Sequence, residues 1–263
     1  MAEFKFITLK ESKGLLTLIL NRPDRLNALL MESLEEIDAA LERAASRKAV
    51  RAVIVTGAGR AFCSGLDLSC LKTFQKETAA GMRRALRKIN TTFNAFEQIE
   101  KPVVAALNGV AVGAGLEIAL ACDVRIAAGG VRMGLVETRV GVMPDGGGCV
   151  RMARNVGIGR AKEMILTGNL IPAEEAHRIG LVNRVVPAKD LGRAARRFAE
   201  ELLQGGPLGI GLAKRVIART YAMDVEAGIE LEALASGPLY ASRDAQEALR
   251  ALKTRRKPRF HGR

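Results

Sequence analysis

The sequence predicts an α/β fold that ends in a helical C-terminal part. Short apolar segments of strand length alternate with amphipathic segments of helix length over residues 1–187, and this alternation is typical of α/β units stacked on one another. Beyond residue 187 the segments are mainly helical. We therefore expect a core over residues 1–187 and a helical region with a basic tail over residues 188–263.

Four segments of the first part predict strands. Each is short, rich in aliphatic residues and bounded by residues that form turns. Residues 180–186 (GLVNRVV) are a candidate for a further strand. In chain order the four segments are LLTLILN (15–21), RAVIVTG (51–57), PVVAALNG (102–109) and VRIAA (124–128).

Two other segments of this part predict amphipathic helices, because their apolar residues recur at the spacing that forms one helix face. The segments are residues 33–46, with Leu34, Ile37, Ala40 and Leu41, and residues 83–100, with Leu86, Ile89, Phe93, Phe96 and Ile99.

The C-terminal part contains four helical segments, of a type that often mediates packing between subunits. They lie at 189–203, 207–222, 224–235 and 242–253. Glycine and proline at 205–207 and again at 237–238 are expected to separate neighbouring helices. The tail at 253–263 carries six basic residues and no acidic ones.

The formal net charge is +13, and three interpretations of it stay open. Nucleic acid attracts basic proteins, but this charge is spread along the chain and only 4% of the residues are aromatic, which disfavours stacking on bases. A small polyanionic substrate fits as well, because a basic field speeds its encounter. A surface that is merely solvated is the third interpretation.

The cysteines, the histidines and the apolar stretches argue against several other classes. The four cysteines have neither metal-site spacing nor a disulfide framework, so we expect reduced thiols and a cytoplasmic protein. His177 and His261 are the only histidines, which makes histidine triads and metal sites poor candidates. We expect no signal peptide, and residues 102–122 are interrupted by polar residues and glycines, so we expect no membrane helix there.

Two glycine-rich turns are the candidate ligand-binding segments. GRAFCSGLDL (59–68) follows one predicted strand, and NGVAVGAGLEIALACD (108–123) follows another. Glycine permits tight turns that aim backbone N–H groups at a ligand, and two convergent donors form an oxyanion hole. Neither turn has the spacing of a nucleotide-binding loop, and Ser64 lacks the G-x-S-x-G context of a nucleophile.

Glu117 is the single charged residue between Asn108 and Asp123. An unpaired carboxylate in an apolar site is costly, so its pKa shifts or it finds partners. On the residues alone, two explanations stay open: a carboxylate that caps a helix N-terminus, and an acid that performs chemistry.

Six segments, in order and nearly from end to end, resemble the enoyl-CoA hydratase/isomerase (crotonase) family. Each is modest alone, but the ordered set with this spacing is specific. They are NRPDRLNAL (21–29), GRAFCSGLDL (59–68), KPVVAALNGVAVGAGLEIALACDVRIAA (101–128), GLVETRVGVMPDGGGCVRMARNVG (134–157), AKEMILTGNLIPAEEAHRIGLVNRVV (161–186) and RRKPRF (255–260).

The resemblance implies a crotonase-like spiral of ββα units whose helical C-terminal region builds homotrimers, often paired as hexamers. It also implies an acyl-CoA thioester as the substrate, so that coenzyme A is part of the substrate and no separate cofactor is needed. By position, the backbone N–H groups of Leu66 and Ala114 form the oxyanion hole for the thioester oxygen. The helix that opens at Ala114 adds its dipole there.

By the same resemblance, Glu117 and Glu137 are the acid/base pair that holds the water of a hydratase. The alternative for Glu137 is a surface acid paired with Arg139. Asp145 departs from the hydratase pattern, which has glycine at this position, and matches the working aspartate of isomerases in the family. Its alternative is a plain turn residue after Pro144.

The resemblance further assigns the substrate and its anionic CoA part to residues of the segment at 21–29, of both glycine-rich turns and of the basic tail. These residues are Arg22, Arg25, Ala61, Ser64, Gly65, Asp67, Leu68 and Gly113, with Lys257 and Phe260 in the tail.

The sequence therefore favours an enoyl-CoA hydratase that adds water across a trans-2-enoyl-CoA. Within the family, the alternative is an isomerase that shifts the double bond of an enoyl-CoA or dienoyl-CoA with the help of Asp145. An RNA-binding or non-catalytic assembly protein is the alternative of another class.

Overall fold

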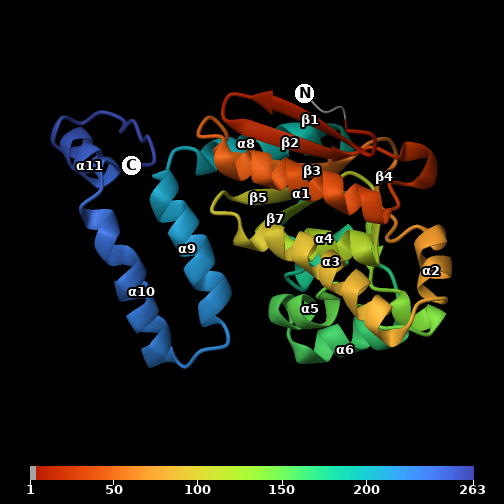
Figure 1. Ribbon diagram of the computed structural model, residues 1–263. Coiled ribbons are helices and arrows are strands. Elements are labelled where there is room, and N and C mark those ends of the chain that lie inside the picture. Colours follow the sequence, from red (N-terminus) through yellow and green to blue (C-terminus); the bar gives the residue numbers. More distant parts are fainter. Residues whose placement is uncertain (1–3) are drawn as a thin grey trace.

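The computed structural model describes residues 4–263. Residues 1–3, which begin the segment for which we expect no signal peptide, lie outside the described part. Two sheets form the centre, and helices surround them (Figure 1). The α/β fold that the sequence predicts is confirmed.

The larger sheet has six strands in the order β1-β2-β3-β5-β7-β10. The first two form an antiparallel hairpin, and all other neighbours are parallel. The smaller sheet has the order β4-β6-β8-β9. The strands are β1 (Ile7–Ser12), β2 (Leu15–Leu20), β3 (Ala52–Gly57), β4 (Ala61–Cys63), β5 (Val103–Leu107), β6 (Val110–Val112), β7 (Val124–Ala128), β8 (Arg132–Gly134), β9 (Ile171–Pro172) and β10 (Arg184–Val186).

All four predicted strands are present as β2, β3, β5 and β7, and the further candidate ends in β10. The sequence does not predict β1, because its second half is polar and exposed. Nor does it predict β4, β6, β8 and β9, which are only two or three residues long and so show no alternation.

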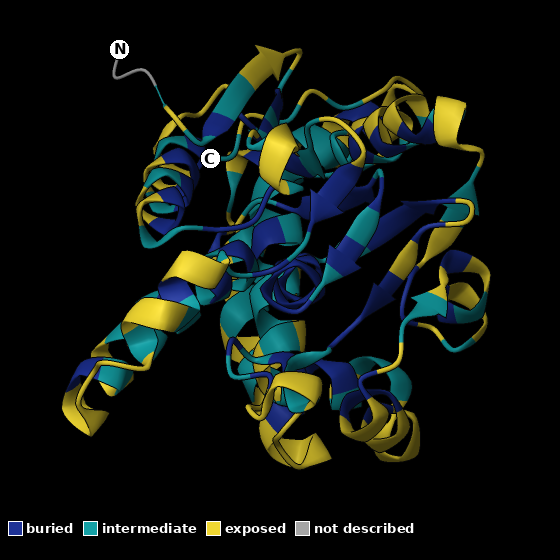
Figure 2. Ribbon diagram, turned by 90° about the vertical axis from the view of Figure 1, so that its right-hand side faces the viewer, coloured by how far each residue is buried: buried dark blue, intermediate teal, exposed yellow. Residues whose placement is uncertain are grey.

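Helices cover the sheets, and both predicted amphipathic helices are confirmed as α1 and α3. Their apolar faces are buried, as Figure 2 shows for the interior of the molecule (dark blue). The helices of this part are α1 (Met31–Ser46), α2 (Leu68–Phe74), α3 (Ala79–Gln98), α4 (Ala114–Ala121), α5 (Gly148–Val156), α6 (Ile158–Thr167) and α7 (Ala173–Arg178), with 3-10 turns η1 (Pro23–Arg25), η2 (Glu137–Val140) and η3 (Ala188–Asp190).

The C-terminal part is helical, with α8 (Leu191–Leu202), α9 (Pro207–Thr220), α10 (Val225–Tyr240) and α11 (Arg243–Lys253). α8 packs against β3, β5 and β7 of the larger sheet. α10 and α11 stand beside the core (Figure 1).

The break expected at residues 237–238 is wrong, because α10 continues through both to Tyr240. Pro238 lies in the last turn of the helix. A proline there removes only one hydrogen bond of the helix, which explains why the helix tolerates it.

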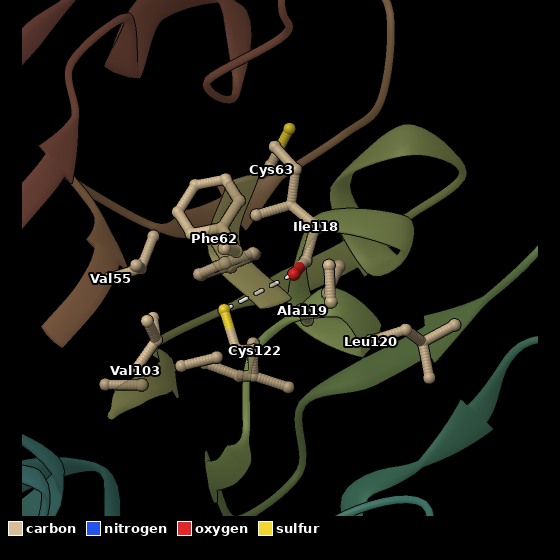
Figure 3. Packing of buried hydrophobic residues seen from close by; sticks show 14 of the residues in the cluster. Val55, Phe62, Cys63, Val103, Ile118, Ala119, Leu120 and Cys122 are labelled. Carbon is tan, nitrogen blue, oxygen red and sulfur yellow. Dashed lines mark hydrogen bonds between the residues drawn. The ribbon is translucent and has the colours of Figure 1, made fainter. Parts of the chain in front are cut away.

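The central helix α4 is buried along its whole length. It packs on β4, β6, α3 and α5. Figure 3 shows Ile118 and Cys122 packed among Val55, Phe62 and Val103. Gly115 permits this approach, because a Cβ there would lie only 2.3 Å from the backbone oxygen of Cys63. The start of α4 is thereby fixed against the glycine-rich turn after β4.

Candidate active site

Glu117 lies in the first turn of α4, and only 3% of its surface is exposed. Its Oε1 accepts a hydrogen bond of 2.8 Å from the backbone N–H of Gly148, the first residue of α5. A Cβ on Gly146 would lie 2.4 Å from Glu117 Oε2, and one on Gly148 would lie 2.7 Å from Oε1. The glycines of residues 146–148 therefore make room for this carboxyl group.

The environment of Glu117 raises its pKa to about 8. Burial is the largest cause, and the charge of Glu137 adds to it. Hydrogen bonds from the backbone N–H groups of Gly148 and Gly146 oppose the shift. The carboxyl is thus held near the point where it gains or loses a proton at neutral to mildly basic pH, as a general acid or base needs.

Glu137 opens η2 and is half-buried at the same site. A Cβ on Gly113 would lie 3.0 Å from Glu137 Oε1, which places this carboxyl beside the start of α4. Its Oε2 is buried and has no hydrogen-bond partner within residues 4–263. Burial raises the pKa of Glu137, and the charge of Asp145 raises it further.

The pairing of Glu137 with Arg139 is not what the structure shows. The guanidinium of Arg139 turns to the end of α6, where its Nε donates to the backbone oxygen of Thr167 at 3.0 Å. Glu137 is therefore a half-buried carboxyl whose Oε2 has no partner within residues 4–263 and is available to a ligand.

Asp145 is half-buried, and burial raises its pKa. Its charge contributes to the raised pKa of both Glu117 and Glu137, so the three acids share one site. Its backbone oxygen accepts a hydrogen bond of 2.9 Å from Asn90 Nδ2 on α3. The structure thus brings together the three acids that the sequence singles out.

The backbone N–H groups of Leu66 and Ala114 lie at the same end of α4. Leu66 forms a bridge with Leu29, in which the hydrogen bonds run through Gly65 and Asp67 and leave the N–H of Leu66 on the other side. Ala114 is the first residue of α4, so its N–H has no partner within the helix. A Cβ on Gly65 would lie 3.6 Å from the nitrogen of Ala114, so the two turns are in contact.

Some residues assigned to CoA binding also have partners within the protein, and their contact with CoA stays a prediction. Arg22 forms an ion pair of 3.0 Å with Asp67 and donates to the backbone oxygen of Ala28. Asp67 also caps the start of α2 through the N–H of Ser69, and the bonds from Ser69 help to hold its pKa near about 2. Ala61 is 1% exposed, and its backbone oxygen accepts from Asn27 and Asn108.

Other residues assigned to CoA remain open to a ligand. Arg25 and Leu68 are exposed, and Leu68 is 72% exposed at the start of α2. Ser64 is partly exposed, and its hydroxyl donates to the backbone oxygen of Arg25 at 3.5 Å. Ser64 and Leu68 are each two residues from Leu66 in the chain, and the bond from Ser64 places Arg25 beside this turn.

Lys257 and Phe260 lie in the tail that follows α11. Phe260 lies 3.8 Å from the position of a Cβ on Gly206, at the start of α9. The tail is fixed there by Asp244, which accepts from the backbone N–H groups of His261 and Gly262 at 2.7 and 2.8 Å. A contact between this tail and CoA remains a prediction.

Three groups of the site are not predicted from the sequence. Gly146 and Gly148 bind or adjoin the carboxyl of Glu117. Cys149 lies beside the acids. Burial is the largest cause of the raised pKa of its thiol, and the charges of Glu117, Glu137 and Asp145 raise it further. The run of three glycines after Asp145 was the available signal, because such a run at a helix start offers free backbone donors.

Within residues 4–263 no group of three or more His, Cys, Asp or Glu side chains could hold a metal ion. None of the helices in this part of the chain is long and apolar enough to cross a membrane.

Comparison with known proteins gives consistent matches over almost the whole chain. A family model described as enoyl-CoA hydratase/isomerase matches residues 10–263. A short-chain-enoyl-CoA hydratase of Clostridium acetobutylicum is 37% identical over 97% of both chains. A crotonyl-CoA hydratase of Syntrophomonas wolfei is 35% identical over 98% of both.

Solved structures agree with these relatives. The crystal structure of an enoyl-CoA hydratase from Bacillus anthracis has a TM-score of 0.92 and 38% identity, covering 98% of this chain and all of that one. A putative enoyl-CoA hydratase from Streptomyces coelicolor has a TM-score of 0.94 and 33% identity, covering 100% and 96%. The fold is therefore the crotonase fold that the sequence resemblance implies.

Proposed function

The chain belongs to the enoyl-CoA hydratase/isomerase family, and from this premise we propose that this enzyme hydrates trans-2-enoyl-CoA thioesters. The observation that carries the proposal is the pair formed by the buried carboxyl of Glu117, in the first turn of α4, and the half-buried carboxyl of Glu137 beside it. Both have a raised pKa, and one oxygen of Glu137 has no partner within the described residues. A water molecule between the two carboxyls supplies what that oxygen lacks.

The thioester oxygen binds the N–H groups of Leu66 and Ala114. As water attacks, negative charge moves onto this oxygen, and two fixed donors stabilise it at no cost of reorganisation. The N-terminus of α4 adds positive potential at the same place. This polarisation makes the β-carbon of the enoyl group open to attack.

The two glutamates then divide the proton transfers. The pKa of both groups is raised, and the proposed reaction uses the pair with one carboxyl protonated and the other ionised. The ionised carboxyl takes a proton from water as its oxygen bonds to the β-carbon. The protonated carboxyl gives its proton to the α-carbon, so the elements of one water are added and the pair regains its starting charge.

We propose a short acyl chain for the substrate. The support is that two relatives, at 37% and 35% identity, are named short-chain-enoyl-CoA hydratase and crotonyl-CoA hydratase.

The experiment that tests hydration is to incubate the purified enzyme with crotonyl-CoA in ¹⁸O-labelled water. We expect labelled 3-hydroxybutyryl-CoA as the main product. If hexenoyl-CoA isomers instead give unlabelled enoyl-CoA with a shifted double bond, the enzyme is an isomerase and not a hydratase.

One observation favours isomerisation as the second candidate. Asp145 is a third carboxyl at the site, and its charge acts on both glutamates. A carboxyl placed further along the acyl chain moves a proton to or from a more distant carbon, which shifts a double bond without water. The two reactions differ in their need for Asp145.

We propose that residues around the glycine-rich turns bind CoA and that copies of the chain associate through the C-terminal helices. Arg25 and Leu68 are the exposed side chains beside Leu66. For association, the support is apolar surface on α9 and α10 that the described residues leave exposed: Ile217, Val225 and Ile229 are each more than half exposed.

A further inference from the structure

The glycine loop that surrounds Glu117, residues 145–148, is held from behind by a polar face of α3. Asn90, Asn94 and Glu97 follow one another at spacings of four and three residues, which places them on one face of this helix. Arg151 on α5 points into the same region, and its side chain is only 9% exposed. These four residues, which we call the loop clamp, lie outside the set that binds substrate.

Arg151 is the centre of the loop clamp. Its Nη2 donates to Asn94 Oδ1 at 2.5 Å and to Glu97 Oε2 at 2.9 Å. Its Nη1 donates to the backbone oxygen of Gly146 at 3.2 Å. The guanidinium thus joins α3 to the glycine loop, and Glu97 compensates its buried charge.

Asn90 holds Asp145, the loop residue that directly precedes Gly146. Its Nδ2 donates to the backbone oxygen of Asp145 at 2.9 Å and to that of Leu86, one turn earlier in α3, also at 2.9 Å. Gly147 packs directly against Arg151, since a Cβ on this residue would lie only 2.1 Å from Arg151 Nη1. Its φ of +94° also favours glycine at this position.

Peptide geometry connects this clamp to the carboxyl of Glu117. In a trans peptide the C=O of one residue and the N–H of the next point in opposite directions. When Asn90 binds the oxygen of Asp145, the N–H of Gly146 is turned the other way. This N–H lowers the pKa of Glu117, though less than the N–H of Gly148 does. Arg151 binds the oxygen of Gly146 and so fixes the next peptide, between Gly146 and Gly147. This peptide lies directly before the one that carries the N–H of Gly148, which donates to Glu117 Oε1 at 2.8 Å.

We propose that Arg151 and Asn90 are positioning residues, which hold the glycine loop in the one shape that keeps two backbone donors on the carboxyl of Glu117. The proposal rests on the proposed function of Glu117 as a proton-transferring group. Its consequence is that the clamp helps to keep the ionised form of Glu117 accessible. The other titratable groups that act on Glu117 are Glu137 and Asp145, with the Cys149 thiol nearby, and the clamp leaves all three in place.

The decisive measurement is the ionisation of Glu117 itself, without substrate. In protein labelled with ¹³C at the glutamate carboxyl, the resonance of Glu117 is the one that Glu117→Gln removes. We expect Arg151→Met and Asn90→Leu each to raise its pKa by about one unit, because donors that favour the carboxylate are lost. Arg151→Lys, which keeps a donor near Gly146, should restore part of the difference.

Arg125→Met is the matched control. Arg125 is as buried as Arg151, at 5% exposed, and also donates to backbone oxygens, those of Leu181, Ala119 and Cys122. It lies at the opposite end of α4. Its loss should lower stability as the loss of Arg151 does, but should leave the titration of Glu117 at its wild-type midpoint.

Turnover separates this inference from the proposed function. With crotonyl-CoA, the clamp variants should lose on the order of 10-fold in kcat with little change in KM, since a small misplacement of a reacting group slows chemistry.

If the wild-type enzyme does not hydrate enoyl-CoA but the Glu117 resonance still shifts in the clamp variants, the proposed function fails and the loop clamp stands. An unchanged Glu117 titration in folded Asn90→Leu, or an equal shift in Arg125→Met, overturns the clamp. Asn90→Leu alone decides if Arg151→Met does not fold.

Discussion

At the scale of single residues, the chemistry depends on how three carboxyl groups share one buried site. Glu117 is neutral at lower pH because it is buried and because Glu137 and Asp145 act on it, while two backbone donors keep its ionised form within reach. Glu137 brings an oxygen without a partner within the described residues. Burial and mutual repulsion therefore disfavour the ionisation of all three carboxyl groups at once. This is the condition under which neighbouring carboxyl groups share a proton.

Replacement of Glu117 by glutamine should keep the shape of the site and remove the proton transfer. We expect kcat for crotonyl-CoA to fall by roughly 10²- to 10⁴-fold, the usual contribution of a positioned acid or base. Steady-state kinetics and CoA binding on the same preparation measure this. Turnover close to that of the wild type on all enoyl-CoA substrates would remove Glu117 from the mechanism.

The same substitution should change stability with a definite pH dependence. The pKa of Glu117 is raised from 4.5 in the ordinary state to about 8 in the fold. The unfolded chain ionises this group first, so the wild type loses stability as pH rises from 4.5 towards 8 and no further above it. Glu117→Gln should therefore be the more stable protein at about pH 9, by up to a few kcal/mol at ~1.4 kcal/mol per pKa unit.

Chemical denaturation at several pH values measures this difference. The control is the low-pH end of the series, where both forms are neutral and the two proteins should unfold at nearly the same denaturant concentration. A stability difference that does not vary with pH would mean that Glu117 titrates normally in the fold.

Asp145 distinguishes hydration from isomerisation. Asp145→Asn keeps the size of the side chain but removes the charge that raises the pKa of both glutamates. In a hydratase, hydration should continue at a similar or slightly higher rate, with the basic limb of the pH profile displaced to lower pH. Loss of a double-bond shift in this variant, with hydration retained, would instead identify Asp145 as the acid of an isomerase.

At the scale of elements, α4 is the part on which the site depends. Its first residue supplies an N–H group, its first turn carries Glu117, and its burial on all sides fixes both. Because Gly115 lets the helix approach Cys63 closely, the turn after β4 brings Leu66 to the same point. An oxyanion hole of this kind is a property of two elements in contact and not of either turn alone.

Ala114→Pro tests the oxyanion hole without removing a functional side chain. Proline is tolerated at the first position of a helix, where the N–H has no helical partner. We expect a loss on the order of 10²–10³ in kcat, the effect of one oxyanion donor. Ala114→Gly, which keeps the N–H, is the matched control and should stay active. Full activity of a correctly folded Ala114→Pro protein would place the hole elsewhere.

At the scale of the whole molecule, the core and the C-terminal helices differ in how well they are covered. The core buries its apolar residues in one continuous cluster. α9 and α10 instead expose large apolar side chains, including Val225 at 79% and Ile229 at 58%. In water such surface favours association, because covering it gains ~25 cal/mol per Å².

We therefore expect the protein to form oligomers through these helices. Light scattering should give a mass that is a multiple of 28.2 kDa, most simply three or six copies. Val225 and Ile229 lie one turn apart on one face of α10, so the double change to glutamate should shift the protein towards a monomer. Glu232→Lys is a control on the same helix. A wild-type protein that stays monomeric at high concentration would contradict this prediction.

The sequence by itself determined the buried strands, both long amphipathic helices and the unusual position of Glu117. Each of these leaves a local signal, because apolar periodicity and a lone charge among apolar residues are visible within one segment. The resemblance to a family supplied Glu137 and Asp145, which periodicity alone does not single out.

Only the tertiary structure decided how these residues meet. Nothing in the sequence near Glu117 shows that Gly146 and Gly148 surround its carboxyl, that Arg139 turns away from Glu137, or that Arg151 holds the loop from behind. The short strands β4, β6 and β8, which bring the turns together, are too brief to show periodicity. The physical reason is that most of these contacts join segments far apart in the chain, such as Glu117 and Gly148, which are 31 residues apart. They depend on which faces pack together, whereas local propensity acts within a single segment.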